Sequence, residues 1–199
     1  LAVFFLARIL GALYFINNID DKDLVARSRR SLIGNSVLFL VFFLSFVIRT
    51  LLADGYAVNP ETGEIFMEPY KYLTNFIEMP VVLVLFLIGV ALVLFGIGKS
   101  LLKPKFDKGI WFTGIGTVLA VLALLLVAGY NHTAYYPSTN DLQSSLTLAN
   151  SCSSEFTLRV MFYVSFLVPF VLAYIFYAWR SIDIHKINEK EMKDGGHSY

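Results

Sequence analysis

Five apolar runs, separated by polar loops, dominate the pattern of this 199-residue chain. They cover residues 1–16, 33–52, 79–98, 110–130 and 158–179. A membrane-spanning helix needs about 20 apolar residues, because each residue adds ~1.5 Å along the axis and the hydrocarbon core is ~30 Å thick. The later runs reach about that length, and the first is shorter. The pattern predicts an all-α integral membrane protein, a bundle of about five transmembrane helices of which the first is truncated.

Lysine and arginine gather in alternate loops, which gives the bundle an orientation. They are frequent in residues 17–32, in residues 99–109 and after residue 180, whereas residues 53–78 contain only Lys71. Residues 131–157 contain neither. Short loops rich in lysine and arginine stay on the cytoplasmic side of a membrane. We therefore expect residues 1–180 to form the transmembrane bundle and residues 181–199 to form a cytoplasmic C-terminal tail.

Composition supports this interpretation. Hydrophobic residues make up 57% of the chain and the mean hydropathy is +0.66, above the range of soluble domains. A formal net charge of +1 gives no reason to expect a nucleic-acid partner. The single cysteine, Cys152, cannot form a disulfide within the chain.

Because the chain starts at Leu1 within a short apolar run, we interpret it as the C-terminal part of a longer protein.

The connections between the runs carry local signals. The charged residues 20–30 are expected to lead into a second helix that starts near Gly34. Turn-forming residues occupy 54–56 and 59–63, in the first of the predicted outer connections. The aromatic-rich residues 70–78 predict a short helix at the membrane interface, where aromatic side chains are enriched.

Prolines and small residues indicate how the spans are shaped. Pro80 suits the first turn of the third span, where the missing N–H costs nothing. Pro104 breaks the chain between the third and fourth spans, so these are expected to form an antiparallel hairpin. Pro169 is expected to kink the last span. Small residues spaced four apart permit close helix contact in lipid, and they occur as two pairs, Ala7 with Gly11 and Gly116 with Ala120.

Residues that could hold a redox cofactor are scarce. Membrane proteins commonly bind haem through histidine or methionine side chains that point inward from spanning helices. Here the histidines, His132, His185 and His197, all lie outside the apolar runs, and Met79 and Met161 lie near helix ends. Phosphate-binding loops, zinc spacings and nucleophile motifs are also missing from the sequence. We therefore predict no catalytic, cofactor-binding or metal-binding residue on this chain.

Two arginines lie within apolar runs. Arg49 is about one turn from the outer end of its run, so it can extend to the interface or meet Asp54. Arg8 is about two turns from the cytoplasmic end of the first run, where an unpaired arginine costs about 2.5 kcal/mol or more. A candidate buried charge at Arg8 therefore needs a partner. A structural ion pair with another helix or subunit is preferred to a direct role in proton or substrate transfer.

The loop before the last span is almost uncharged and dense in hydroxyl groups, which can satisfy backbone groups locally. Its order is a Pro-Ser turn, a Ser-Leu-Thr segment, and a Ser-Ser pair followed by Thr157-Leu158 and Met161 at the start of the span. This order resembles the loop before the last helix in subunit II of the cytochrome bd-type quinol oxidases. The candidate subunit-contact residues are Pro137, Ser138, Ser145, Thr147, Ser153, Ser154 and Thr157.

Shorter matches to the same family run along the chain, in the segments 11–14, 26–30, 54–56 and 168–179. The resemblance implies a membrane subunit of a terminal oxidase that oxidises quinol and reduces O2 to water, and so contributes to the proton-motive force. It implies a bacterial cytoplasmic membrane, with haem b and haem d on subunit I as partner. Membrane lipid, quinone and small accessory subunits are the other partners that it suggests.

Two other classes of function stay open from the sequence alone. A fragment of a secondary transporter or channel would need broken helices or charge near mid-bilayer, and only Arg8 and Pro169 point that way. A membrane assembly scaffold would show the same hydrophobic pattern. The sequence also departs from the resembling subunits in length, since these are about twice as long, and no catalytic residue is transferred from them.

Overall fold

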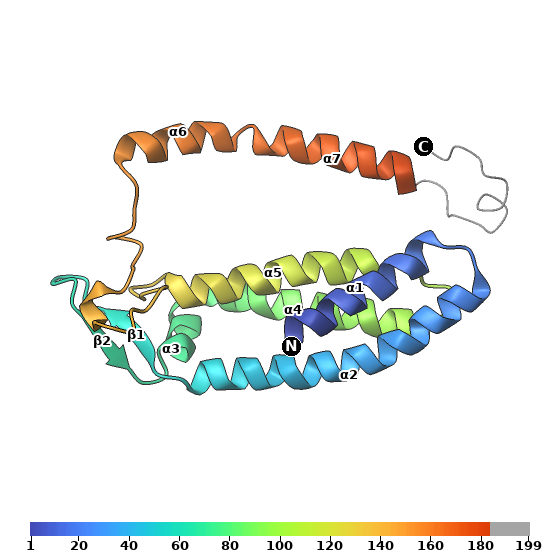
Figure 1. Cartoon of the computed structure of the whole chain (residues 1–199), viewed down its shortest axis with the longest axis horizontal. Coiled ribbons are helices and arrows are strands. Elements are labelled where there is room, and N and C mark those ends of the chain that lie inside the picture. The colour runs from blue at the N-terminus through green and yellow to red at the C-terminus, as the bar shows by residue number, and fades with distance from the viewer. Residues whose placement is uncertain (184–199) are drawn as a thin grey trace.

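The computed structural model describes residues 1–183. They contain a helical bundle, capped at one end by a small hairpin and a long loop, and a last helical segment beside the bundle (Figure 1). The helices are α1 (Ala2–Asn18), α2 (Lys22–Leu52), α3 (Lys71–Glu78), α4 (Pro80–Leu102), α5 (Gly109–Gly129), α6 (Glu155–Ser165) and α7 (Val168–Asp183), with a 3-10 turn η1 (Leu142–Ser144) and the strands β1 (Gly55–Val58) and β2 (Ile65–Glu68). Within that part of the chain α2, α4, α5 and the α6–α7 pair are long and apolar enough to cross a membrane, and α1 is shorter. The predicted all-α membrane fold is confirmed.

Helix α2 begins at Lys22, so the expectation of a start near Gly34 was wrong. The side chain of Asp21 caps the helix by accepting a hydrogen bond from the backbone N–H of Leu24 at 2.7 Å. The lysine, arginines and leucines that follow are good helix formers, and Leu32, just after the charged residues, is fully buried against the bundle. At 31 residues the helix is about 46 Å long, well beyond the ~30 Å hydrocarbon core.

Helices α4 and α5 form the predicted antiparallel hairpin, and glycines bring their backbones into contact. A Cβ atom on Gly89 would lie 2.6 Å from the backbone nitrogen of Ala120. A Cβ atom on Gly116 would lie 2.6 Å from the carbonyl oxygen of Gly89. The small pair in α5 is therefore used as predicted, whereas Ala7 and Gly11 of α1 are exposed and do not contact another helix in this way.

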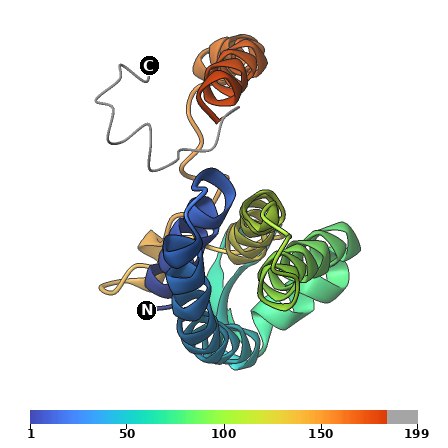
Figure 2. The same ribbon diagram turned by 90° about the vertical axis from the view of Figure 1, so that its right-hand side faces the viewer.

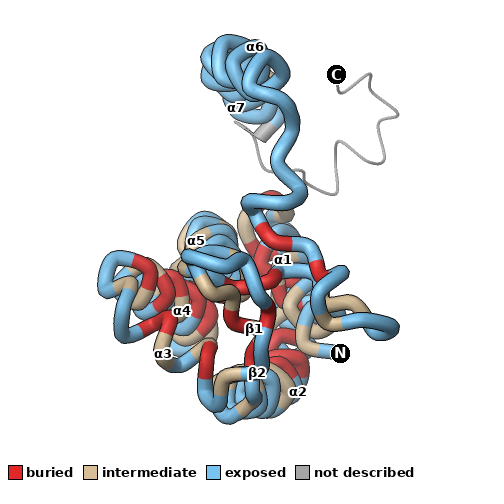
Figure 3. The backbone as a smooth tube through the Cα atoms, turned by 90° about the vertical axis from the view of Figure 1, so that its left-hand side faces the viewer, coloured by how far each residue is buried: buried red, intermediate tan, exposed pale blue. Residues whose placement is uncertain are grey.

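Two clusters of buried side chains hold the bundle together. One joins α1, α2 and α4, and the other joins α3, α4 and α5. Figure 2 shows the helices seen end-on, and Figure 3 shows that buried residues concentrate between them. The members are Ile9, Ala12, Leu13, Ile16, Leu32, Phe39, Val93 and Ile97 in the first cluster and Phe76, Val82, Phe86, Ala120, Ala123 and Val127 in the second.

The connection after α2 forms a cap over one end of the bundle. Strands β1 and β2 pair antiparallel, with Val58 opposite Ile65, and the predicted turn at residues 59–63 joins them through Gly63 at φ 72°. The strands themselves were not predicted, because four-residue strands lack a readable alternation. The predicted short helix at residues 70–78 is confirmed as α3, and Pro80 is confirmed in the first turn of α4.

The last apolar segment lies apart from the bundle (Figures 1 and 2). The predicted kink at Pro169 is a break between α6 and α7, because proline removes a backbone hydrogen bond and its ring clashes with the carbonyl of Ser165. Every residue from Glu155 to Tyr177 is exposed. Helix α7 continues to Asp183, past the predicted end of the bundle at residue 180, and the rest of the predicted tail lies outside the described residues.

Candidate functional site

Asn75 of α3 organises the cap. Its side chain is fully buried, and its Nδ2 donates to the carbonyl of Val127 and to the hydroxyl of Thr133, both at 2.9 Å. Its Oδ1 accepts from Asn131 at 3.1 Å, and Asn131 also donates to Glu78 at 2.5 Å. One amide thus joins α3, the end of α5 and the following loop. Sequence reasoning missed it, because a lone asparagine in a short helix gives no signal.

The loop after α5 is held against the hairpin. Asn131 and His132 both adopt left-handed conformations, which turn the chain so that Thr133 pairs with Ala57. Further along, the side chain of Gln143 donates to the carbonyl of Ile65 at 2.8 Å and accepts from its N–H at 2.9 Å. The loop therefore binds both strands, β1 through Thr133 and β2 through Gln143. Hairpin and loop together form the cap.

The predicted contact residues divide into two groups, of which the first is internal to the loop. Ser145 and Thr147 are buried. The Ser145 hydroxyl donates to Leu142 at 2.7 Å and accepts from the N–H of Ser138 at 3.0 Å, while Thr147 and Asn150 bind one another. Pro137 and Ser138 are half-buried. These side chains hold the loop together, as their hydroxyl content suggested.

The second group, Ser153, Ser154 and Thr157, is exposed at the start of α6. Ser154 is the N-cap residue of helix α6, and its hydroxyl oxygen accepts a hydrogen bond from the backbone N–H of Thr157 at 3.4 Å. The structure brings this group together with α6 and not with the buried serine and threonine of the loop. The hydroxyl oxygens of Ser154 and Thr157 lie 3.0 Å apart and share a hydrogen bond.

Next to the cap, two ionisable side chains of α3 are withdrawn from solvent. Lys71 is buried and forms an ion pair with Glu68 at 3.2 Å, packed against the backbone of Gly55. Burial raises the pKa of the Tyr72 phenol, and the neighbouring Tyr56 raises it further. Tyr72 therefore stays a neutral hydrogen-bonding group at physiological pH.

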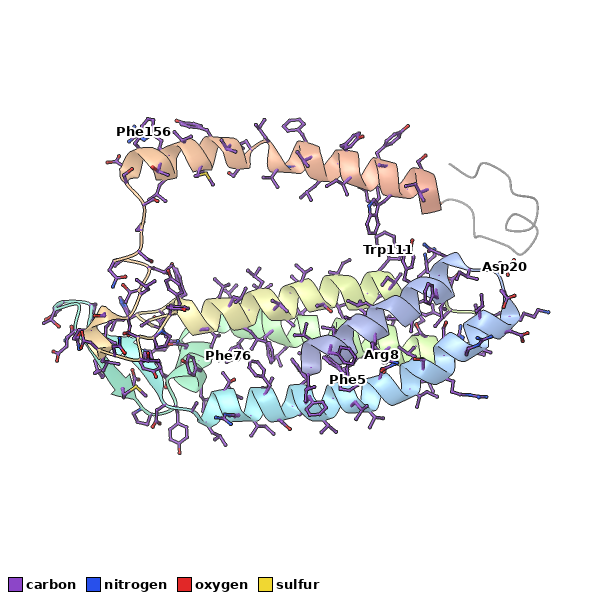
Figure 4. All side chains as sticks on the ribbon, viewed as in Figure 1. Phe5, Arg8, Asp20, Phe76, Trp111 and Phe156 are labelled. Atoms are coloured by element: carbon purple, nitrogen blue, oxygen red, sulfur yellow. The ribbon has the colours of Figure 1, made fainter. Side chains whose placement is uncertain are left out.

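The two arginines of the apolar runs are both exposed on the described chain. Arg8 lies on α1 (Figure 4), with its guanidinium 5.8 Å from the centre of the Phe4 ring. Neither it nor Arg49 belongs to an ion pair among residues 1–183, so the predicted alternative of an Arg49 contact with Asp54 is not formed. The partner predicted for Arg8 is not supplied by this part of the chain.

A third arginine, which the sequence did not single out, ties α2 to the end of α4. Arg29 donates to the carbonyl of Pro104 at 2.7 Å and also binds the carbonyl of Ser100. Lys99 lies 4.8 Å from the ring centre of Phe95 and 4.6 Å from that of Phe106. Cations near the C-terminus of a helix interact well with its dipole. This lysine-rich connection is therefore anchored to the charged part of α2.

An apolar groove of about 480 Å³ runs between α1, α2, α4 and α5. Phe39, Phe43 and Val93 lie on its walls. The polar exception is Thr117, whose hydroxyl donates to the carbonyl of Thr113 at 2.7 Å and is thereby satisfied. With such walls, the groove suits hydrocarbon rather than a polar substrate.

The described residues do not fit a haem. His132 is the one histidine among residues 1–183, and it lies exposed in the loop after α5. Met79 is half-buried just before α4, and Met161 is exposed on α6. Within the same residues no group of three or more histidine, cysteine or acidic side chains comes together to hold a metal. His185 and His197 lie outside the described residues.

The bundle, its apolar exterior and its glycine-packed hairpin define a multi-pass α-helical membrane protein. Residues 1–182 match the family model described as cytochrome bd terminal oxidase subunit II. The chain belongs to this family, and the resemblance noted from the sequence is confirmed.

Three curated relatives share the name cytochrome bd-I ubiquinol oxidase subunit 2 and come from Escherichia coli strain K12, strain O6:H1 and O157:H7. Each is 28% identical to this chain over 156 residues, which make up 77% of this chain and 39% of the relative. The chain therefore spans about two fifths of the length of the curated relatives that it matches.

Proposed function

We propose that this chain is part of the membrane subunit of a quinol:O2 oxidoreductase of the cytochrome bd type that binds no haem itself. The complex oxidises quinol, reduces O2 to water, and contributes to the proton-motive force across the bacterial cytoplasmic membrane. The observation that carries the proposal is the family match over residues 1–182. The donor set of the described residues agrees with a chain that leaves haem ligation to its partner.

In this proposal haem b and haem d belong to subunit I and supply the electron-transfer and O2 chemistry. The residues of this chain supply surface. Helices α6 and α7 expose many aromatic and aliphatic side chains, and Ser153, Ser154 and Thr157 lie exposed where that surface meets the cap. An apolar surface of this extent suits lipid and neighbouring helices of the complex. The ordered cap then fixes where α6 begins.

The test of the activity uses the native complex purified from its membrane. Absorption spectra are recorded after reduction with dithionite, and O2 consumption is measured with a short-chain quinol. Bands of b-type and d-type haem, together with quinol-dependent O2 uptake, are the expected result. A purified complex that contains this subunit but lacks both haem bands would overturn the proposal.

A second experiment tests the division of labour. His132, His185 and His197 are changed together to alanine in the full-length subunit, and haem is measured per assembled complex. We expect unchanged haem content, because His132 lies exposed in a loop and the apolar runs contain no histidine. A complex that assembles normally but lacks one haem would show that this subunit provides a ligand.

A further inference from the structure

A shallow groove of about 410 Å³ lies between α1 and α2, on the side of the link that joins them. Its lining from α1 includes Arg8, Gly11 and Ala12, and its lining from α2 includes Arg27, Ser28 and Ser31. Arg8 lies three and four residues before Gly11 and Ala12, and Ser31 lies three and four residues after Ser28 and Arg27, so each set shares one helix face. The α2 half of the groove exists only because the helix starts at Lys22.

Shape and charge suit the groove to an anion. Gly11 and Ala12 carry little or no side chain, and a Cβ atom on Gly11 would meet no atom within 4 Å, so the floor is open. Two arginines, Arg8 and Arg27, line it, and its lining contains no carboxylate. Among residues 1–183 neither Arg8 nor Arg27 takes part in a hydrogen bond or ion pair with another side chain.

Hydroxyl groups complete the set of donors. The Ser31 hydroxyl accepts a hydrogen bond from Asn35 at 3.0 Å, which leaves its proton free to donate. Ser28 lies one turn nearer the link and half-buried. Two arginines and two hydroxyls can together satisfy the oxygens of a phosphate group, since arginine binds phosphate through paired N–H groups.

The length and charge of α2 indicate that the groove is near headgroup depth, because the helix is longer than the hydrocarbon core and its first residues are charged. Arg8 and Ser31 are about equally far from the link at residues 19–21, so the antiparallel packing of α1 and α2 sets them at similar height. Ser31 directly follows the charged part of α2 and precedes its apolar part. Arg29, two residues away, binds the last carbonyls of α4. Arg8 is therefore closer to the membrane surface than its place in an apolar run suggests.

We propose that this groove binds the headgroup of an anionic phospholipid, with the phosphodiester between Arg8 and Arg27. Basic grooves between helices at the membrane surface attract such headgroups. Phe15 and Leu24 also line the groove and offer apolar contact near its rim. A single partner carboxylate would be matched by one arginine, whereas the spread of two arginines and two hydroxyls fits the several oxygens of a phosphodiester.

The experiment uses the full-length subunit in its native complex. The complex is exchanged into nanodiscs that contain phosphatidylglycerol and phosphatidylcholine, and native mass spectrometry counts the lipids that stay bound. A variant carrying Arg8→Gln and Arg27→Gln is compared with wild type and with Arg30→Gln. The last is a matched control, because Arg30 is exposed on α2 outside the groove and its change removes the same charge.

We expect wild type and Arg30→Gln to retain phosphatidylglycerol selectively. Each groove arginine contributes about fivefold to affinity, so the double variant should lose about 25-fold. The variant with Arg8→Lys and Arg27→Lys should recover part of the binding, because charge is kept. If the double glutamine variant does not assemble, Arg27→Gln alone provides the measurement, with a loss of about fivefold expected.

Three outcomes would overturn the proposal. Equal retention of phosphatidylglycerol by wild type and the double variant would remove the groove as its site. Displacement of the lipid signal by millimolar inorganic phosphate, with no preference for phosphatidylglycerol, would indicate a site for free phosphate. Loss of the partner subunit while phosphatidylglycerol stays bound would assign Arg8 to an ion pair with that subunit.

Discussion

At the scale of single residues, hydrogen bonds of the buried Asn75 and Ser145 join the segments of the cap. Asn75 is fully buried and binds Val127, Thr133 and Asn131. A buried donor or acceptor that loses its partner costs about 1–3 kcal/mol, more than the net gain of a typical hydrogen bond. The cap is therefore sensitive to the loss of one amide.

Changing Asn75 to alanine should destabilise the full-length protein by about 1–3 kcal/mol, because three polar groups lose their partner. The thermal midpoint of the detergent-solubilised protein, followed by intrinsic fluorescence, measures the effect. Asn140→Ala is the control, because Asn140 is an exposed asparagine in the loop between α5 and α6. Equal midpoints for the two variants would mean that the Asn75 network does not hold the cap.

The sequence could predict only part of this arrangement. The hydroxyl-rich composition of residues 137–157 indicated local hydrogen bonding, and Ser145 and Thr147 confirm it. The contacts of Asn75 and Gln143 join segments more than fifty residues apart. No local pattern encodes such pairs, because they depend on how the helices place the loop.

At the scale of helices, apolar length predicted the spans, but the polar extension of α2 escaped it. Residues 22–31 are too charged to count as a span, yet lysine, arginine and leucine favour helix and Asp21 supplies a cap. Hydropathy identifies the apolar part of a helix that lies in lipid, but it does not identify a charged extension of the same helix outside the lipid. The groove between α1 and α2 was hidden for the same reason.

The α4–α5 hairpin offers a matched pair of glycine substitutions within one helix. A Cβ atom at Gly89 would lie 2.6 Å from the backbone nitrogen of Ala120, whereas one at Gly98 would meet nothing within 4 Å. Gly89→Ala should therefore force the helices apart at a cost of about 1–3 kcal/mol. Gly98→Ala should be neutral or slightly stabilising, because alanine favours helix over glycine.

The yield of folded, monodisperse protein and its thermal midpoint compare these variants. A lower midpoint for Gly89→Ala than for wild type, with Gly98→Ala at or above wild type, is the expected order. If Gly89→Ala matched Gly98→Ala, the close approach of α4 and α5 would not contribute to stability.

At the scale of the whole molecule, the hydrophobic pattern predicted the number and order of the spans, but not their mutual packing. Helices α6 and α7 have the composition of a span, and their side chains from Phe156 to Tyr177 stay exposed. The sequence of that segment does not tell whether the helix packs on its own bundle or on a neighbouring subunit. Lipid tails are as apolar as the side chains of the segment, so hydrophobicity alone favours neither arrangement.

The orientation of the bundle is the last prediction, and it rests on the alternation of basic loops. Cysteines are introduced singly at Glu64, Asn140 and Lys105 of the full-length subunit after Cys152→Ser. All three residues are exposed, the first two at the cap and the third between α4 and α5. In intact cells an impermeant maleimide should label the first two within the time in which Lys105→Cys stays unlabelled. After the cells are opened, Lys105→Cys should react as fast as the others. Labelling of Lys105→Cys from outside would invert the proposed topology.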